Sequence, residues 1–182
     1  PVLRQETSHA VPGGAGNVLA NLTALGATAS FVGIAGEDVE ADELEALLGA
    51  ASPQGRIELL RDGSRPTTSK TRFVAANQQL LRLDRETARP GGPELAGRVV
   101  EAVLARLEGC DLLVLSDYGK GVVTRDTAQP LIEAARRLGR PVLVDPKGRD
   151  FSRYAGATVV TPNRAELAVA AGGDVGDDEA LA

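Results

Sequence analysis

Three short polar clusters in this sequence each follow a run of apolar residues. They are residues 116–121 (Ser-Asp-Tyr-Gly-Lys-Gly), 145–148 (Asp-Pro-Lys-Gly) and 161–166 (Thr-Pro-Asn-Arg-Ala-Glu). A short apolar run bounded by turn residues is typical of a strand buried on both faces. Open α/β sheets bind ligands outside the carboxyl ends of their parallel strands. We therefore expect these clusters to meet at one edge of a sheet and to form a binding site.

Several side chains in these clusters are suited to hydroxyl groups, phosphates or a cation. Asp117 could accept hydrogen bonds from hydroxyls, and Lys147 could neutralise a nucleotide phosphate. Asn163 and Glu166 could order a hydrated Mg²⁺, which prefers few carboxylates and several waters. Each has a plain structural alternative: Asp117 and Lys147 lie in turns, and Asn163 with Glu166 three residues later resembles a helix capping box.

A glycine-rich segment, Gly13-Gly14-Ala15-Gly16-Asn17, precedes an apolar helical pattern. Glycines allow close approach to a ligand, and a helix N-terminus offers free N–H groups. Gly13, Gly14 and Asn17 are therefore candidates for binding a substrate oxygen, the alternative being an ordinary glycine turn. The segment is a poor dinucleotide fingerprint because no strand precedes it and Leu19 and Leu22 stand where a third glycine is needed. The Gly-Lys-Ser/Thr of a P-loop is absent from the sequence.

The section 56–86 has a different residue pattern from the rest of the chain, one typical of strands and not of helices. Its alternating residues predict a small antiparallel flap over the main sheet, with strands at 56–61, 67–76 and 79–84. Within it, Lys70, Arg72 and Arg82 could clamp a phosphate, and the alternative is a solvated strand face. Asn77 and Gln79 suit sugar hydroxyls, or they simply form a polar turn.

The remaining pattern is a regular alternation of strands and helices. Helices are predicted at 15–25, 41–48, 94–107, 128–138 and from 164, and strands at 27–35, 111–116, 141–145 and 157–161. Such alternation implies a parallel sheet with right-handed crossovers, hence an α/β fold.

Composition narrows the class of protein. The 182 residues are 43% hydrophobic and 25% charged, as in a globular domain, and the formal net charge of -5 argues against nucleic acid as a partner. No apolar run is long enough to predict a membrane span. The single cysteine excludes an internal disulfide, and a cytoplasmic location is expected.

At this point the motifs resemble a known family. Residues 12–26 are similar to the Gly-Gly-x-x-Asn signature of the ribokinase-like carbohydrate kinases, and residues 161–166 to their Asn-x-x-Glu magnesium motif. More narrowly, residues 70–72, 77–84, 116–121 and 145–148 resemble the bacterial D-glycero-D-manno-heptose 7-phosphate kinases. The run 77–84 (Asn-Gln-Gln-Leu-Leu-Arg-Leu-Asp) is the most specific part, because general sugar kinases do not share it.

The resemblance implies a ribokinase-like three-layer αβα sandwich with a mostly parallel sheet and a β-lid at 56–86. It implies ATP-dependent, Mg²⁺-assisted phosphorylation of the anomeric hydroxyl of heptose 7-phosphate, on the route to ADP-heptose and the lipopolysaccharide core. The site residues carried over are the sugar ligands Gly13, Gly14 and Asn17, the phosphosugar ligands Lys70, Arg72 and Arg82, and Lys147, Asn163 and Glu166 for Mg-ATP. A homodimer through the β-lid is also implied.

The resemblance further implies a partial kinase domain over 1–182, truncated at both ends. The family's catalytic Asp would lie beyond Ala182, so we expect no catalytic residue in this chain and no turnover by it alone. Two alternatives stay open: another ribokinase-like kinase acting on ribose, fructose or a phosphofructose, and a non-catalytic nucleotide- or sugar-binding module.

Overall fold

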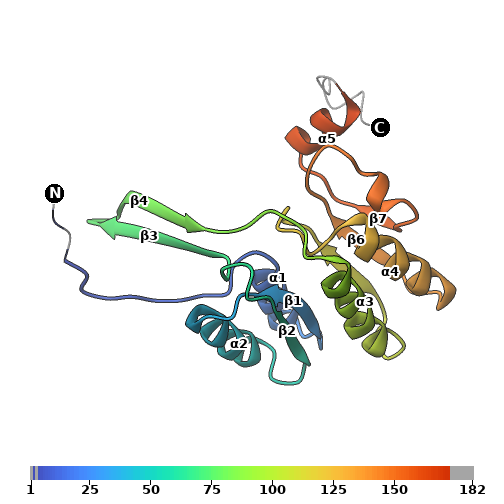
Figure 1. The fold of residues 1–182 in the computed structure, drawn as a ribbon, viewed down its shortest axis with the longest axis horizontal. Helices are drawn as coiled ribbons and strands as arrows, with labels where there is room; N and C mark the ends of the chain where they lie inside the picture. Colours follow the sequence, from blue (N-terminus) through green and yellow to red (C-terminus); the bar gives the residue numbers. More distant parts are fainter. Residues whose placement is uncertain (1, 3, 173–182) are drawn as a thin grey trace.

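A computed structural model of the chain describes residues 2 and 4–172 as an α/β fold with a projecting hairpin (Figure 1). In chain order the elements are α1 (Gly14–Ala24), β1 (Phe31–Ala35), α2 (Val39–Ala51), β2 (Ile57–Arg61), β3 (Ser69–Ala75), β4 (Gln78–Arg85), α3 (Pro93–Leu107), β5 (Leu113–Ser116), α4 (Arg125–Arg137), β6 (Val142–Asp145), η1 (Ser152–Tyr154), β7 (Val159–Val160) and α5 (Arg164–Ala171). The predicted alternation of strands and helices is confirmed.

The strands with the three polar clusters at their ends are neighbours in one parallel sheet. Its order is β5-β6-β7, with Ser116 opposite Asp145 and Val144 opposite Val160. The ladder continues past the strands, because the Asp117 N–H donates to the Asp145 carbonyl at 2.9 Å and the Thr161 N–H to the Val144 carbonyl at 2.9 Å. The polar clusters therefore leave the sheet at the same edge, as predicted.

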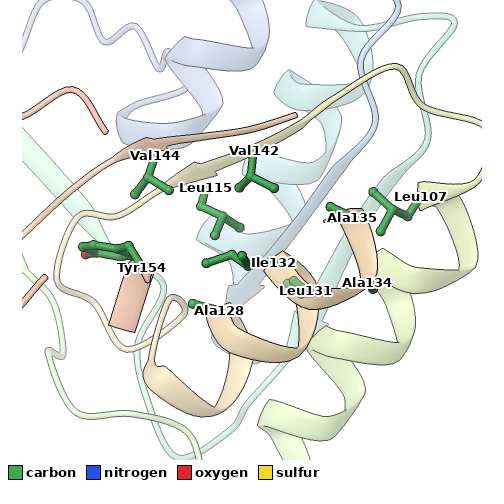
Figure 2. Close-up of a cluster of buried hydrophobic side chains, with 10 residues drawn as sticks. All are labelled: Leu107, Leu115, Ala128, Leu131, Ile132, Ala134, Ala135, Val142, Val144 and Tyr154. Atoms are coloured by element: carbon green, nitrogen blue, oxygen red, sulfur yellow. The ribbon is translucent and has the colours of Figure 1, made fainter. Parts of the chain in front are cut away.

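The main buried core lies between this sheet and α4. The helix presents Ala128, Leu131, Ile132 and Ala135, which share a face at helical spacing, and all are buried. Figure 2 shows these side chains packed under Leu115, Val142 and Val144, with Tyr154 at one end of the cluster. Thr124 begins α4 with a capping box shared with Thr127. The core thus fixes the backbone from which the polar loops emerge.

A second parallel pair, β1 and β2, packs against the first half of α3. Leu60 of β2 is buried with Leu95 and Val99 of α3. Helix α1 contacts β5, and helix α2 contacts β2. Helices α3 and α4 pack against each other. These contacts form the three layers of an αβα sandwich.

One boundary of the predicted flap is wrong. Residues 57–61 form β2, which runs parallel to β1 with Phe31 opposite Ile57, so they belong to the layered domain. The antiparallel hairpin consists of β3 and β4 alone. The strand 57–61 has no local hairpin partner, because the chain from Arg61 to Ser69 leads into a different sheet.

The β3–β4 hairpin projects away from both parallel sheets in Figure 1. Every residue of β4 is exposed, and β3 is exposed or half-buried. The connecting turn uses Ala76 (φ 47°) and Asn77 (φ 64°), two left-handed residues in succession, as in the tight hairpin turns that match strand twist.

In the described residues, no helix combines the length and apolarity that crossing a membrane requires.

Candidate functional site at the strand-end edge

The strand-end loops are joined by side-chain contacts across all three strands. The Lys147 ammonium, after β6, pairs with Glu166 Oε1 at 2.8 Å, at the start of α5. This hydrogen bond lowers the pKa of Glu166 and raises the pKa of Lys147. Asn163 and Glu166 form the capping box foreseen as the structural alternative: the Glu166 N–H donates to Asn163 Oδ1 at 2.9 Å, and the Asn163 N–H donates to Glu166 Oε2 at 3.1 Å.

Asp117 is buried within the loop that follows β5 and is 4% exposed. Its Oδ1 accepts the Gly119 N–H at 2.7 Å, and its Oδ2 accepts the Tyr154 hydroxyl at 2.6 Å. The Arg153 guanidinium lies 3.7 Å from the same oxygen. Both carboxylate oxygens are thus engaged inside the protein, so Asp117 organises this loop and is not open to a sugar hydroxyl in this structure.

The glycine-rich start of α1 lies beside the same loop. Gly14 has φ +50°, and a Cβ placed on it would lie 3.5 Å from the Tyr118 ring. No side chain caps the helix at Gly13, so its first N–H groups are open to another acceptor. Asn17, one turn into α1, is exposed. The structure therefore brings the glycine motif and the β5 loop together, as expected for a shared site.

One face of the hairpin carries the predicted cations together with the carboxylate of Asp84. In the ladder, Lys70 is opposite Asp84 and Arg72 is opposite Arg82. Lys70 pairs with Asp84 at 2.7 Å, and Arg82 pairs with the same carboxylate at 2.8 Å. Lys70 and Arg82 are thus partly neutralised by a residue of β4. Within the described part of the chain, Arg72 has no ion-pair partner.

Glu86 connects this hairpin face to the strand-end edge. Its carboxylate pairs with the Lys70 ammonium at 3.0 Å and with the Lys120 ammonium, in the β5 loop, at 2.6 Å. The hydrogen bonds from Lys120 and Lys70 lower the pKa of Glu86. The base of the hairpin and the β5 loop are therefore held together by a chain of alternating charges.

Asn77 and Gln79 lie at the far end of the hairpin. Asn77 is a turn residue and Gln79 is the second residue of β4. At about 3.3 Å per residue, the seven residues from Lys70 to Asn77 span roughly 23 Å. The structure therefore does not bring these two predicted sugar ligands to the strand-end loops of the same chain.

Sequence reasoning missed a buried arginine that anchors the hairpin stem, by which we mean the segments 62–68 before β3 and 86–90 after β4. The Arg65 guanidinium donates to Asp62 Oδ2 at 2.8 Å, to the Lys120 carbonyl at 3.0 Å and to the Arg89 carbonyl at 3.0 Å. It joins the two stems of the hairpin to the β5 loop, and its side chain is 5% exposed. Tyr154 and Glu86 were also missed. Tyr154 carried one signal, as a rare aromatic between two predicted strands in a chain that is 3% aromatic.

A hollow of about 490 Å³ lies elsewhere, near the start of α2. Its lining includes Glu37, Asp38 and Asp42, with Arg61 as its cation. Three carboxylates around one arginine would repel a phosphorylated ligand. We therefore place the candidate site at the strand-end edge, where lysines and helix N–H groups converge.

Comparison with known proteins identifies the family of the chain. The pattern of the pfkB family carbohydrate kinases matches residues 1–182. The chain is 47% identical over 181 residues to the bifunctional protein HldE of Acidiphilium cryptum, covering 100% of this chain and 37% of that protein. It is 46% identical to HldE of Paramagnetospirillum magneticum, over 98% of this chain and 36% of that protein.

Solved structures share the fold. The tetrameric inhibited form of phosphofructokinase-2 from Escherichia coli has a TM-score of 0.71 at 21% identity, over 93% of this chain and 55% of that chain. Arabidopsis thaliana ribokinase complexed with ribose and ATP has a TM-score of 0.68 at 16% identity, over 99% of this chain and 58% of that chain. The chain spans little more than a third of the HldE proteins, at 37% and 36% of their lengths. The chain belongs to the pfkB family of carbohydrate kinases.

Proposed function

We propose that this chain supplies the sugar-binding part of an ATP-dependent kinase that converts D-glycero-D-manno-heptose 7-phosphate to the 1,7-bisphosphate. The observation that carries the proposal is the contact chain from the hairpin cations through Glu86 to Lys120 at the strand-end edge. It joins a cationic face, suited to the 7-phosphate, to the loops suited to the sugar and the nucleotide. The 47% identity to an HldE protein supports the same assignment.

The substrate phosphate binds to the hairpin face that carries Arg72 and Arg82. These two side chains are directly opposite each other across the ladder, and like charges so placed destabilise a sheet. A phosphate between them removes the repulsion and gains charge-assisted hydrogen bonds. Lys70 has a supporting role, because Asp84 and Glu86 already hold its ammonium and raise its pKa.

The sugar hydroxyls bind at the start of α1. The open N–H groups after Gly13 act as donors, and the Asn17 amide can both donate and accept. Gly14 lies beside the Tyr118 ring of the β5 loop, and its φ of +50° is a conformation that favours glycine. Sugar orientation therefore depends on the glycines and on the position of the loop.

Mg-ATP binds at the ends of β6 and β7. Lys147 meets the nucleotide phosphates, and Asn163 and Glu166 hold Mg²⁺ through water. Their donor set fits, because one carboxylate and one amide suit a cation that keeps several waters. Burial, and then the charge of Glu166, raise the pKa of the nearby Asp145. Mg²⁺ supplies neutralisation of the charge that develops on the phosphates.

Phosphoryl transfer depends on positioning and charge neutralisation more than on covalent chemistry. The residues described here bind and orient, and none is assigned as the base that removes the hydroxyl proton. ATP and Mg²⁺ are the cofactors, the phosphosugar is the small-molecule partner, and the enzyme acts in the cytoplasm.

The second face of the hairpin pairs two copies of the chain. It carries Thr71, Phe73, Leu81 and Leu83, which are opposite one another in the ladder. Leu81 and Leu83 are 55% and 58% exposed, which leaves a continuous apolar strip in water. We assign this strip to a homodimer contact, since a second copy offers a matching surface.

A coupled assay for ADP release, run on the full gene product, tests the function. We expect turnover with heptose 7-phosphate, abolished by chelation of Mg²⁺, and kcat/KM at least about 100-fold higher than for ribose, fructose or fructose 6-phosphate. Equal or better turnover of one of those sugars would replace the proposed substrate. Nucleotide binding without any phosphorylation would favour a binding module.

A further inference from the structure

Tyr154 contacts two of the three strand-end loops with one oxygen atom. It lies in η1, between β6 and β7, and is 2% exposed. In Figure 2 its ring closes one end of the core cluster, and its hydroxyl points away from the other labelled side chains. The hydroxyl donates to Asp117 Oδ2 at 2.6 Å and accepts the backbone N–H of Lys147 at 3.2 Å.

We propose that Tyr154 is a positioning residue for the kinase reaction, which rests on the proposed function. Its hydroxyl holds the loop after β5 against the loop after β6, so that the Lys147 ammonium faces the nucleotide phosphates. Gly119, with φ +66°, lies beside the Lys147 side chain, since a Cβ placed on it would be 3.4 Å from Lys147 Cγ. Besides the backbone bond from the Asp117 N–H to the Asp145 carbonyl, the hydroxyl thus supplies a side-chain hydrogen-bond link between the two loops.

The hydroxyl is a dependable donor in this position. Burial, and then the bond to Asp117, raise the pKa of Tyr154 to about 12, so the phenol stays protonated at neutral pH. Without it, Asp117 Oδ2 would keep only the Arg153 guanidinium at 3.7 Å. A buried carboxylate oxygen that loses its donor tends to draw in water or to move. Either change would loosen the β5 loop where it meets the Lys147 backbone, although the Asp117 N–H would still donate to the Asp145 carbonyl.

The ring and the hydroxyl have separable roles. The ring packs in the core and meets Phe151 at a centroid distance of 5.9 Å. Tyr154→Phe keeps this packing and removes the oxygen. Phe151→Leu is the matched control, because it disturbs the same packing and leaves both hydrogen bonds of the hydroxyl in place.

The test measures the Kd of Mg-ADP by calorimetry and both KM values, on the full gene product. For Tyr154→Phe we expect Kd for Mg-ADP and KM for Mg-ATP to rise about tenfold, with KM for the phosphosugar unchanged. Phe151→Leu should lower Tm by a few degrees, as Tyr154→Phe should, but it should leave the Kd and both KM values unchanged. Arg153→Gln, at a side chain that is 28% exposed, should raise the nucleotide constants about twofold, and it serves if Tyr154→Phe does not fold.

Equal effects on nucleotide and sugar constants, or a lower Tm with unchanged constants in Tyr154→Phe, would overturn the proposal. So would an Arg153→Gln variant that binds Mg-ADP as the wild type does. The calorimetric readout does not need heptose 7-phosphate. If another sugar proves to be the substrate, the proposed function fails while the role of Tyr154 is still decided by Mg-ADP binding.

Discussion

The strand-end edge of β5–β7 and the β3–β4 hairpin both contribute to the proposed site, but they are built in opposite ways. The edge emerges from a core in which Val142, Val144 and Ile132 are at most 1% exposed, and its loops are tied by buried hydrogen bonds. The hairpin buries no residue of its strand β4, and one of its faces carries ion pairs that are exposed to solvent. Substitutions in the first region should therefore cost folding free energy, whereas substitutions in the second should cost ligand or partner binding.

The largest effect is expected from the core under the edge. Ile132→Ala should lower the free energy of unfolding by about 3 kcal/mol, because it leaves a cavity beneath the sheet, whereas Val74→Ala on the hairpin should cost less than about 0.5 kcal/mol. Ile132 is 1% exposed and Val74 is 61% exposed. Denaturant unfolding of both variants checks this. Similar losses would mean that the hairpin is packed against something in solution.

The next effect is on binding at the hairpin. Arg72→Ala should raise KM for the phosphosugar about 100-fold, equivalent to roughly 2.7 kcal/mol of charge-assisted hydrogen bonding, with Tm unchanged. Arg56→Ala, at an exposed arginine just before β2, is the matched control and should change neither quantity. Steady-state kinetics with thermal unfolding provide both readouts. An unchanged KM in Arg72→Ala would show that the substrate phosphate does not bind to this face of the hairpin.

A smaller effect concerns the apolar face of the hairpin. Leu83→Glu should weaken self-association by about 2 kcal/mol, since it places a charge where a leucine is to be buried. Leu25→Glu, at a leucine that is 85% exposed after α1, should leave the assembly intact. Light scattering over a dilution series reports the mass. A wild type that is already monomeric at micromolar concentration would contradict the proposed dimer contact.

The smallest effect is the acid sensitivity of the hairpin stem. Hydrogen bonds from Ser64, and then the Arg65 guanidinium, lower the pKa of Asp62 to about 2 from an ordinary value of 3.8. A lowered pKa means that the stabilisation is fully present above pH 3.8 and is lost as pH falls toward 2. After solvent screening we expect about 1 kcal/mol from this group. Asp62→Asn should flatten the stability profile in that window, and an unchanged slope would show that the stem does not titrate.

The β5–β7 edge could be predicted because its signals are local. Each strand is an apolar run, and the polar cluster follows it within the same few residues. The hairpin strands were found for the same reason. The parallel partner of β2 was not, because Phe31 and Ile57 are far apart in the sequence and a parallel pair has no connecting turn to reveal it.

The contacts that assemble the site are long-range and have no sequence signal of their own. Tyr154 meets Asp117 across 37 residues, and Arg65 meets Lys120 across 55. Sequence reasoning also treated Lys70 and Arg82 as free cations, whereas Asp84 lies within reach of both. The charged residues of the hairpin could be predicted from the sequence. Which cation pairs with which carboxylate depends on the register of the two strands and could not be predicted.

The reach of Arg65 has a consequence for the nascent chain. Its acceptor at Lys120 leaves the ribosome 55 residues after Arg65 itself. At about 5–20 residues per second, the guanidinium waits roughly 3–11 s for that carbonyl. Until then Arg65 can bond only to Asp62 and Arg89, so the hairpin can form before its attachment to the β5 loop is complete.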